Sequence, residues 1–175
     1  MSSGGVVSRS EALTSAPFAF GGRVTLDASV DTPATLRTTL PLRGSRIEVS
    51  FDLRVVKLDS AVAAVLRLKA ASELTLFIGR PAGNDLDLRY ADLNTGTTYV
   101  TPPTPPQLGE TFRLTFALDR TQQSIEVSVR NAANSFKRTV FGIGQADSLF
   151  IELGPRSSDP GAQVETRIDS VIVRH

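Results

Sequence analysis

Residue types that build many catalytic, metal-binding and sugar-binding sites are scarce in this chain of 175 residues. It has no cysteine and no tryptophan, and its one histidine is the last residue, His175. The lack of cysteine excludes disulfide bonds, thiol nucleophiles and thiolate metal sites. Histidine triads and histidine zinc sites are not expected either, because a residue at a loose chain end is a poor catalytic base. Any catalysis would have to use carboxylates, lysine or tyrosine.

An excess of charge of one sign is missing as well. Nineteen lysines and arginines face eighteen aspartates and glutamates, which gives a formal net charge of +1. We expect no nucleic-acid partner, because nucleic-acid binding depends on a strong basic surface. We also expect no membrane span, because the chain has no apolar run of about 18 residues or more. Residues 1–5 lack the charged and apolar regions of a signal peptide.

The most frequent pattern in the sequence is an alternation of apolar and polar residues with period two. In residues 46–55, the positions of odd number are apolar and those of even number are polar or charged. Such a segment forms a strand with one buried and one solvated face. The pattern predicts strands at 23–26, 34–40, 46–55, 61–68, 73–78, 86–90, 111–118, 124–129, 136–141, 148–153 and 165–174, with a hairpin connection at 119–123.

Residues 61–71 are the one segment that could also form a helix, because they are rich in alanine and leucine. We favour a strand there, since a helix would interrupt the series of strands. The predicted fold class is all-β, an antiparallel two-sheet jelly-roll sandwich. Strand parity predicts a core that contains Ile47, Val49, Phe51, Leu114, Phe116, Ile125, Val127 and Val171.

The proline-rich segment 101–107 could be a linker, a ligand-binding loop or a long turn. Neither flanking half of the chain has enough strands to close a sandwich of its own, so we expect a stiff loop inside one domain. The predicted organisation is a flexible N-terminal segment at 1–17 followed by one jelly-roll domain at 18–175. The loop either borders a ligand cleft together with Tyr99 or only braces the edge of the sandwich.

The order of the strands resembles that of the concanavalin A-like lectin/glucanase superfamily, which includes laminin-G-like domains. The segment Phe150-Ile-Glu-Leu-Gly154 followed by Ile168-Asp-Ser-Val-Ile-Val173 carries most of the resemblance. It implies a concanavalin A-like jelly roll of two curved antiparallel sheets. The glucanases of this superfamily carry Glu-x-Asp-x-x-Glu on one strand, and this chain has no such motif. The expectation is therefore a non-catalytic protein similar to versions found in the bacterial cell envelope, and not an enzyme.

Candidate ligand-binding residues lie in the loop at 79–87 and beside the proline-rich segment. They combine a guanidinium, an amide, two carboxylates and a tyrosine ring, and they are Arg80, Asn84, Asp85, Asp87 and Tyr99. The resemblance to laminin-G-like domains makes calcium a candidate ligand of the two aspartates. A polar turn leading into a strand explains the same residues without a ligand. Tyr90 shares the parity of leucines and is expected to pack in the core, as are most of the nine phenylalanines.

Two functions stay open at this point. The first is a carbohydrate- or surface-binding domain of the bacterial cell envelope, whose partner is a glycan. The alternative is a structural or protein-interaction domain of an envelope lipoprotein, whose partner is an envelope protein. Both imply an extracellular or cell-envelope location, and the Ser-Ser-Gly-Gly start would suit a tether that follows a lipid-anchored cysteine.

Overall fold

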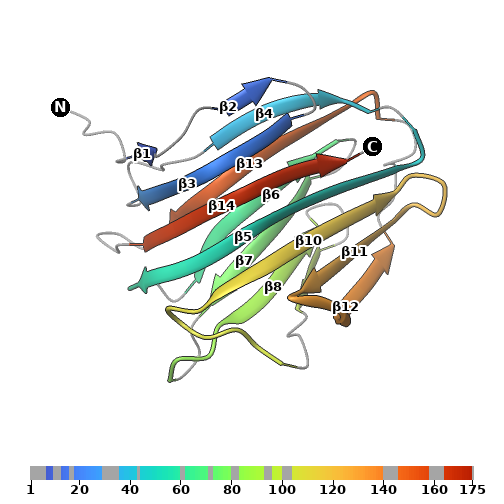
Figure 1. The fold of residues 1–175 in the computed structure, drawn as a ribbon. Helices are drawn as coiled ribbons and strands as arrows, with labels where there is room; N and C mark the ends of the chain where they lie inside the picture. Colours follow the sequence, from blue (N-terminus) through green and yellow to red (C-terminus); the bar gives the residue numbers. More distant parts are fainter. Residues whose placement is uncertain are drawn as a thin grey trace.

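The computed structural model of the chain is built from β-strands (Figure 1). Prolines at several loop positions fall outside the described part, as does the loop residue Arg80. The structure describes residues 7–9, 13–15, 18–28, 36–42, 44–59, 62–70, 73–79, 83–92, 96–99, 104–139, 146–157 and 164–174.

Two antiparallel sheets account for the fourteen strands of the described residues. The eight-stranded sheet has the order β1-β3-β14-β5-β10-β11-β12, with β2 also paired to β3. Its strands are β1 (Val7–Arg9), β2 (Leu13–Ser15), β3 (Phe18–Ala28), β5 (Arg46–Leu58), β10 (Thr111–Asp119), β11 (Ser124–Val129), β12 (Asn131–Thr139) and β14 (Val164–Arg174). The six-stranded sheet has the order β4-β13-β6-β7-β8-β9. Its strands are β4 (Leu36–Pro41), β6 (Val62–Lys69), β7 (Glu73–Gly79), β8 (Asp87–Asp92), β9 (Gly96–Tyr99) and β13 (Ser148–Ser157).

The predicted fold class is confirmed. The described residues form no helix, and the sheets stack as the two layers of a jelly-roll sandwich (Figure 1). The ambiguous segment at 61–71 forms β6, which pairs with β7 and β13. No helix in the described ranges is long and apolar enough to cross a membrane.

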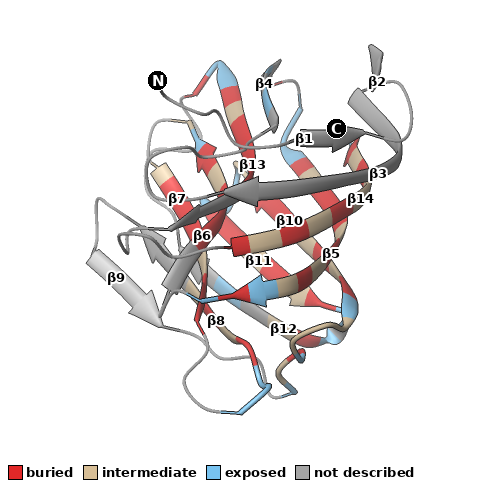
Figure 2. Cartoon of the chain, turned by 90° about the vertical axis from the view of Figure 1, so that its left-hand side faces the viewer, coloured by how far each residue is buried: buried red, intermediate tan, exposed pale blue. Residues whose placement is uncertain are grey.

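The core lies between the sheets, where buried positions alternate with more exposed ones along the strands (Figure 2). Phe51 and Phe116 stack at its centre, with ring centroids 6.1 Å apart. The predicted core is confirmed, since each member is no more than 1% exposed: Ile47, Val49, Phe51, Leu114, Phe116, Ile125, Val127 and Val171. The alternation is what makes each strand bury one face against the opposite sheet.

The N-terminal segment at 1–17 contains two short strands, and its flexibility stays a prediction. Its residues 7–9 and 13–15 form β1 and β2, and both pair with β3 at the edge of the eight-stranded sheet. These strands are only three residues long, too short for an alternation pattern to show in the sequence.

The proline-rich segment connects β9 in one sheet to β10 in the other. Of this segment, residues 104–107 are described. The Pro106 carbonyl accepts a hydrogen bond of 2.8 Å from the Leu86 N–H. Arg130 donates to the Thr104 carbonyl and forms two hydrogen bonds with the carboxylate of Glu110. The loop is thus fastened to both sheets, as a brace would be.

Candidate functional site

The outer face of the six-stranded sheet gathers charged and aromatic side chains from five neighbouring strands. We call it the charged face and define it by its outward side chains Arg37, Arg67, Lys69, Glu73, Thr75, Phe77, Asp87, Arg89, Phe150 and Glu152. The strand register aligns these side chains in rows that cross the strands. One row runs from Arg37 on β4 through Glu152, Arg67 and Thr75.

A buried carboxylate lies within this row. Glu152 is only 4% exposed although it points away from the core. Its Oε2 lies 3.3 Å from Arg67 Nη1 and 3.4 Å from Arg37 Nε. A buried carboxylate is costly unless it is paired and hydrogen-bonded, so the two arginines offset the cost of burying Glu152.

Arg67 is held by two carboxylates at once. Its Nε and Nη2 donate to Glu73 Oε1 at 2.9 and 2.7 Å, while Nη1 donates to Glu152. A planar guanidinium with donors fixed on both sides loses most of its freedom to rotate. Arg67 is therefore a rigid part of the face and is largely saturated by its own partners.

Two other cations on the face keep donors available. Arg37 is 57% exposed, and its contact with Glu152 uses Nε. Lys69 is exposed and makes no hydrogen bond or ion pair with another described residue. Lys69 is directly opposite Phe150 on β6, and Arg37 lies diagonally across from Phe150 on β4, where it is opposite Glu152. This corner of the face can hold an anionic group beside an apolar ring.

Two phenylalanines on the charged face are only half-buried, Phe77 on β7 and Phe150 on β13. The sequence prediction assigned most phenylalanines to the core and missed this pair. Their position in the alternation indicates that they point outward, because Phe77 alternates with buried Leu76 and Ile78. Strand spacing and rise place the two rings roughly 15 Å apart, a span suited to an extended ligand.

The predicted ligand residues fall into three groups. Asp87 lies on the charged face, where its carboxylate pairs with Arg89. Tyr99 lies on β9 directly opposite Arg89, and its side chain is outside the described part. Arg80 is not among the described residues. That these residues bind a ligand stays a prediction.

Asn84 and Asp85 lie in the turn before β8 and away from the rows of the charged face. Both are exposed, and Asp85 Oδ1 accepts a hydrogen bond of 3.3 Å from Gln107 Nε2. The Asn84 carbonyl accepts a hydrogen bond of 2.7 Å from Leu108. Within the described residues, no group of three or more histidines, cysteines, aspartates or glutamates could hold a metal ion. That calcium binds the two aspartates stays a prediction.

The geometry defines an antiparallel jelly roll with a charged outer face, and comparisons with known proteins agree on the fold. No protein-family model and no curated protein matches the chain. Among solved structures, the family 7 alginate lyase A1-II′ is similar with a TM-score of 0.63 and 13% identity, over 93% of this chain and 85% of the lyase.

Two further solved structures have the same fold. The alginate lyase AlyA1 from Zobellia galactanivorans is similar with a TM-score of 0.65 and 10% identity, over 93% of this chain and 82% of that one. A functionally unknown protein from Saccharomyces cerevisiae is similar with a TM-score of 0.64 and 11% identity, over 97% and 95% of the two chains. At these identities the comparisons establish a shared jelly roll.

These structures correct the expectation that the chain is not an enzyme. That expectation rested on the missing glucanase motif, and the alginate lyases are enzymes with the same fold. A motif that belongs to one group of enzymes is no guide to another group on the same scaffold, because function depends on the site and not on the fold. The resemblance to non-catalytic envelope proteins in particular finds no support among these structures.

Proposed function

We propose that this protein acts on an acidic polysaccharide, which it binds on the charged face of the six-stranded sheet. The observation that carries the proposal is the corner where Arg37 and Lys69 keep donors available beside the half-buried ring of Phe150. The fold that the chain shares with alginate lyases supports the same substrate class, since alginate is a carboxylated polysaccharide.

The residue types suit such a ligand. Aromatic rings supply apolar contact area for the faces of sugar rings, at a low cost in conformational entropy. Guanidinium and ammonium groups bind carboxylates through charge-assisted hydrogen bonds. Four basic side chains on the face, Arg37, Arg67, Lys69 and Arg89, outnumber its three acidic ones, so the face attracts a polyanion weakly and in a salt-dependent way.

The ion pairs of Arg67 hold the centre of the charged face in one arrangement before a ligand binds. Glu152 and Glu73 fix Arg67, so the centre of the face is already ordered between Arg37 and Lys69. A site whose parts are already ordered loses less entropy when a ligand binds. The reaction class to test is eliminative cleavage, the activity in the names of the similar solved structures.

The test measures alginate binding by isothermal titration calorimetry at low ionic strength. We expect Arg37→Gln, Lys69→Gln and Phe150→Ala each to weaken binding about three- to tenfold, as for the loss of one partly exposed contact. Arg46→Gln is the matched control, because Arg46 is an exposed arginine of the other sheet. Equal binding by all variants, or no binding of alginate or another carboxylated polysaccharide, would contradict the proposal.

Cleavage is measured on the same samples. An eliminative reaction creates a carbon–carbon double bond in the product, and its ultraviolet absorbance grows with time. We place this activity outside the cytoplasm, at the cell surface or beyond it, because polymers of this kind are met there. The location is part of the proposal, and fractionation of the producing cells tests it.

A further inference from the structure

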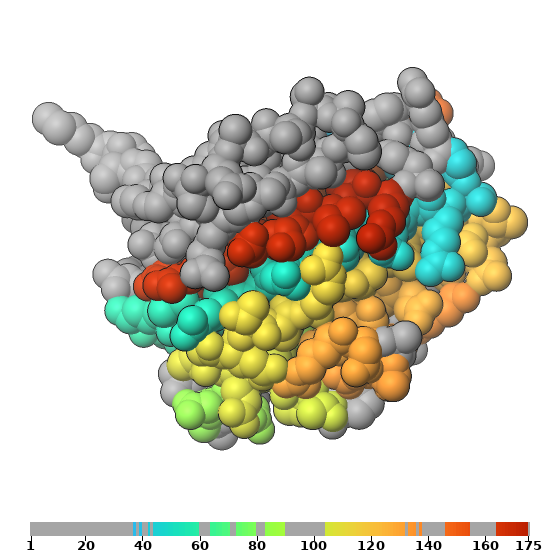
Figure 3. All heavy atoms as spheres, viewed as in Figure 1, coloured from blue at the N-terminus to red at the C-terminus, as the bar shows by residue number. Residues whose placement is uncertain are grey.

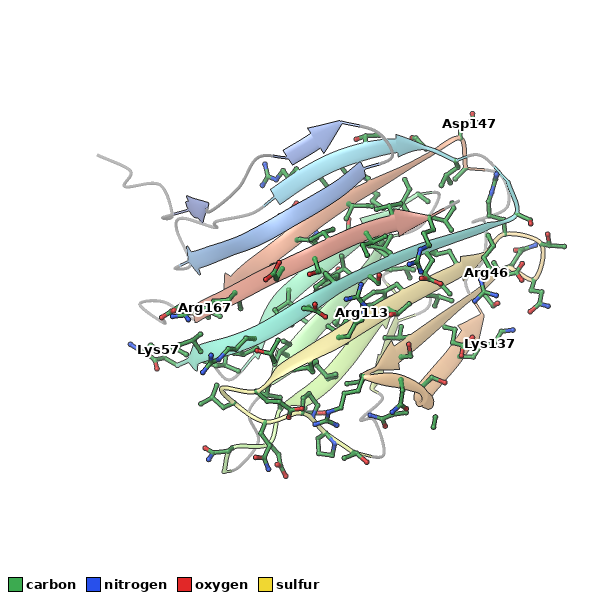
Figure 4. The ribbon with its side chains drawn as sticks, in the orientation of Figure 1. Arg46, Lys57, Arg113, Lys137, Asp147 and Arg167 are labelled. Atoms are coloured by element: carbon green, nitrogen blue, oxygen red, sulfur yellow. The ribbon has the colours of Figure 1, made fainter. Side chains whose placement is uncertain are left out.

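The opposite face of the sandwich carries a pair of arginines that the charged face does not involve. Arg54 on β5 and Arg167 on β14 are directly opposite each other in the strand register, and both are only partly buried. The strands β14, β5 and β10 lie side by side across this face (Figure 3). Arg113 lies near its middle and Arg167 towards one end (Figure 4).

The two guanidinium groups have unused donors. The Nε atoms of both Arg54 and Arg167 are buried and have no hydrogen-bond partner. Arg167 makes one long contact, 3.6 Å from its Nη2 to Glu165 Oε1. Arg54 forms no ion pair or hydrogen bond through its side chain within the described ranges.

Such an arrangement is unfavourable in the absence of a ligand. Like charges directly opposite each other in a sheet are destabilising. A buried donor without a partner adds the cost of its lost hydration. Asp52, on the same face, is shared with a third arginine, because its Oδ1 accepts a hydrogen bond of 3.0 Å from Arg113 Nη1.

A small pocket opens at this place. It has a volume of about 70 Å³ and is lined by Asp52, Arg54, Thr111, Arg167 and Asp169. Thr111 is opposite Arg54 on the other side of β5, so the row Arg167–Arg54–Thr111 lies along one edge of the pocket. Its two carboxylates, Asp52 and Asp169, lie together in the neighbouring row. The pocket thus has a basic side and an acidic side.

We propose that Arg54 and Arg167 form an oxyanion-binding site that takes a single sulfate or carboxylate group. Two guanidinium groups facing one pocket can donate several parallel hydrogen bonds to the oxygens of such a group. The anion would neutralise the like-charge pair and give partners to the buried Nε donors. The hydroxyl of Thr111 offers one more donor at the edge. The pocket volume suits the anionic group itself and not a sugar ring.

This site is separate from the charged face and does not depend on the function proposed for it. The two outer faces of a sandwich point in opposite directions and are divided by the core. The same chemistry can reach the pocket as a free inorganic anion or as an anionic group on a larger molecule. The acidic row beside the arginines favours a ligand with one isolated anionic group, because a second negative group would approach Asp52 or Asp169.

The test titrates the intact protein with inorganic sulfate and follows the arginine Nε–H signals by nuclear magnetic resonance, at constant ionic strength kept with chloride. We expect saturable shifts of the Arg54 and Arg167 signals. Arg54→Gln and Arg167→Gln should each weaken sulfate binding at least tenfold. Arg46→Gln, on the same strand and the same face as Arg54, should leave it unchanged. Two separate arginine variants keep the test valid if one of them folds poorly.

Thermal stability gives a second measurement. Sulfate stabilises proteins in general through its exclusion from their surface, so a rise in melting temperature is informative only as a difference between variants. We expect the rise to be larger for the unmodified chain and for Arg46→Gln than for Arg54→Gln. A linear, equal response of all three proteins, with no saturable shift at either arginine, would overturn the proposal.

A second arm replaces sulfate by acetate and then by an alginate oligosaccharide. Shifts with acetate would extend the site to carboxylates, and shifts with the oligosaccharide would show that the anionic group can belong to a sugar chain. Loss of alginate binding in Arg37→Gln with intact sulfate binding would separate this site from the charged face. Retained alginate binding with no sulfate response would refute the oxyanion site alone.

Discussion

Replacing Arg67 with methionine tests how the charged face is held together. Methionine keeps an unbranched apolar side chain and removes the guanidinium, so two carboxylates lose their main partner. Glu152, which is 4% exposed, would keep the 3.4 Å contact with Arg37 Nε. Glu73 would lose hydrogen bonds of 2.9 and 2.7 Å.

The size of the expected loss in stability follows from the burial of Glu152 and its partners. Removing one partner of a fully buried ion pair costs about 3 to 5 kcal/mol, because the other charge stays buried. Arg67 is itself 27% exposed and Arg37 remains in place, so the full cost does not apply. We expect Arg67→Met to lower the free energy of unfolding by about 2 to 3 kcal/mol.

Urea denaturation measures this free energy, provided that the slope with urea concentration stays constant. Arg174→Met is the control, because Arg174 pairs with Glu48 at 2.9 Å and is 65% exposed. An exposed pair of this kind is worth less than about 1 kcal/mol. The double variant Arg67→Met with Glu152→Gln should recover part of the loss, since no buried charge is left behind. Equal costs for Arg67→Met and Arg174→Met would refute the reasoning.

Three further substitutions test the core and the loops. Phe116→Ala should cost about 3 to 5 kcal/mol, since the ring is 1% exposed and stacks on Phe51; a near-neutral result in urea denaturation would contradict its place in the core. Arg120→Ala should cost about 2 kcal/mol, because its guanidinium donates to three backbone carbonyls of neighbouring segments; an unchanged melting temperature would show that water replaces it. Arg130→Gln should speed amide hydrogen exchange at Thr104 and Gln107, the two residues of 104–107 that carry an amide hydrogen, and unchanged protection there would mean that Glu110 and Arg130 do not fasten the loop.

Strand parity predicted most of the core from the sequence. The alternation in 46–55 and 111–118 is long enough that the buried face is unambiguous, and a shift by one residue would expose every apolar side chain. The same rule could have identified Phe77 and Phe150 as outward residues. The parity of Phe51, Phe112 and Phe116 was extended to most phenylalanines, without a separate check of these two.

Other features depend on contacts that no local pattern contains. Arg67 and Glu152 are 85 residues apart in the sequence and meet only because β13 pairs with β6. The opposition of Arg54 and Arg167 likewise comes from the pairing of β5 with β14, which join distant parts of the chain. Within its own strand, each of these four residues follows the pattern of an ordinary charged residue on a solvated strand face. The sequence therefore predicts which side chains point outward, while the sheet order decides which of them become a site.

The two outer faces differ in how their charges are satisfied, and this difference separates the two proposed sites. On the charged face, Glu152 and Glu73 already hold Arg67 by hydrogen bonds. A ligand can therefore bind there without breaking these ion pairs. On the opposite face, Arg54 and Arg167 lie opposite each other with unpaired Nε donors. A bound anion would offset their repulsion and accept hydrogen bonds from these donors. Side chains on the two faces are separated by sheets about 10 Å apart, a distance at which substitutions act nearly independently. A loss of polysaccharide binding and a loss of anion binding can therefore each be traced to one face.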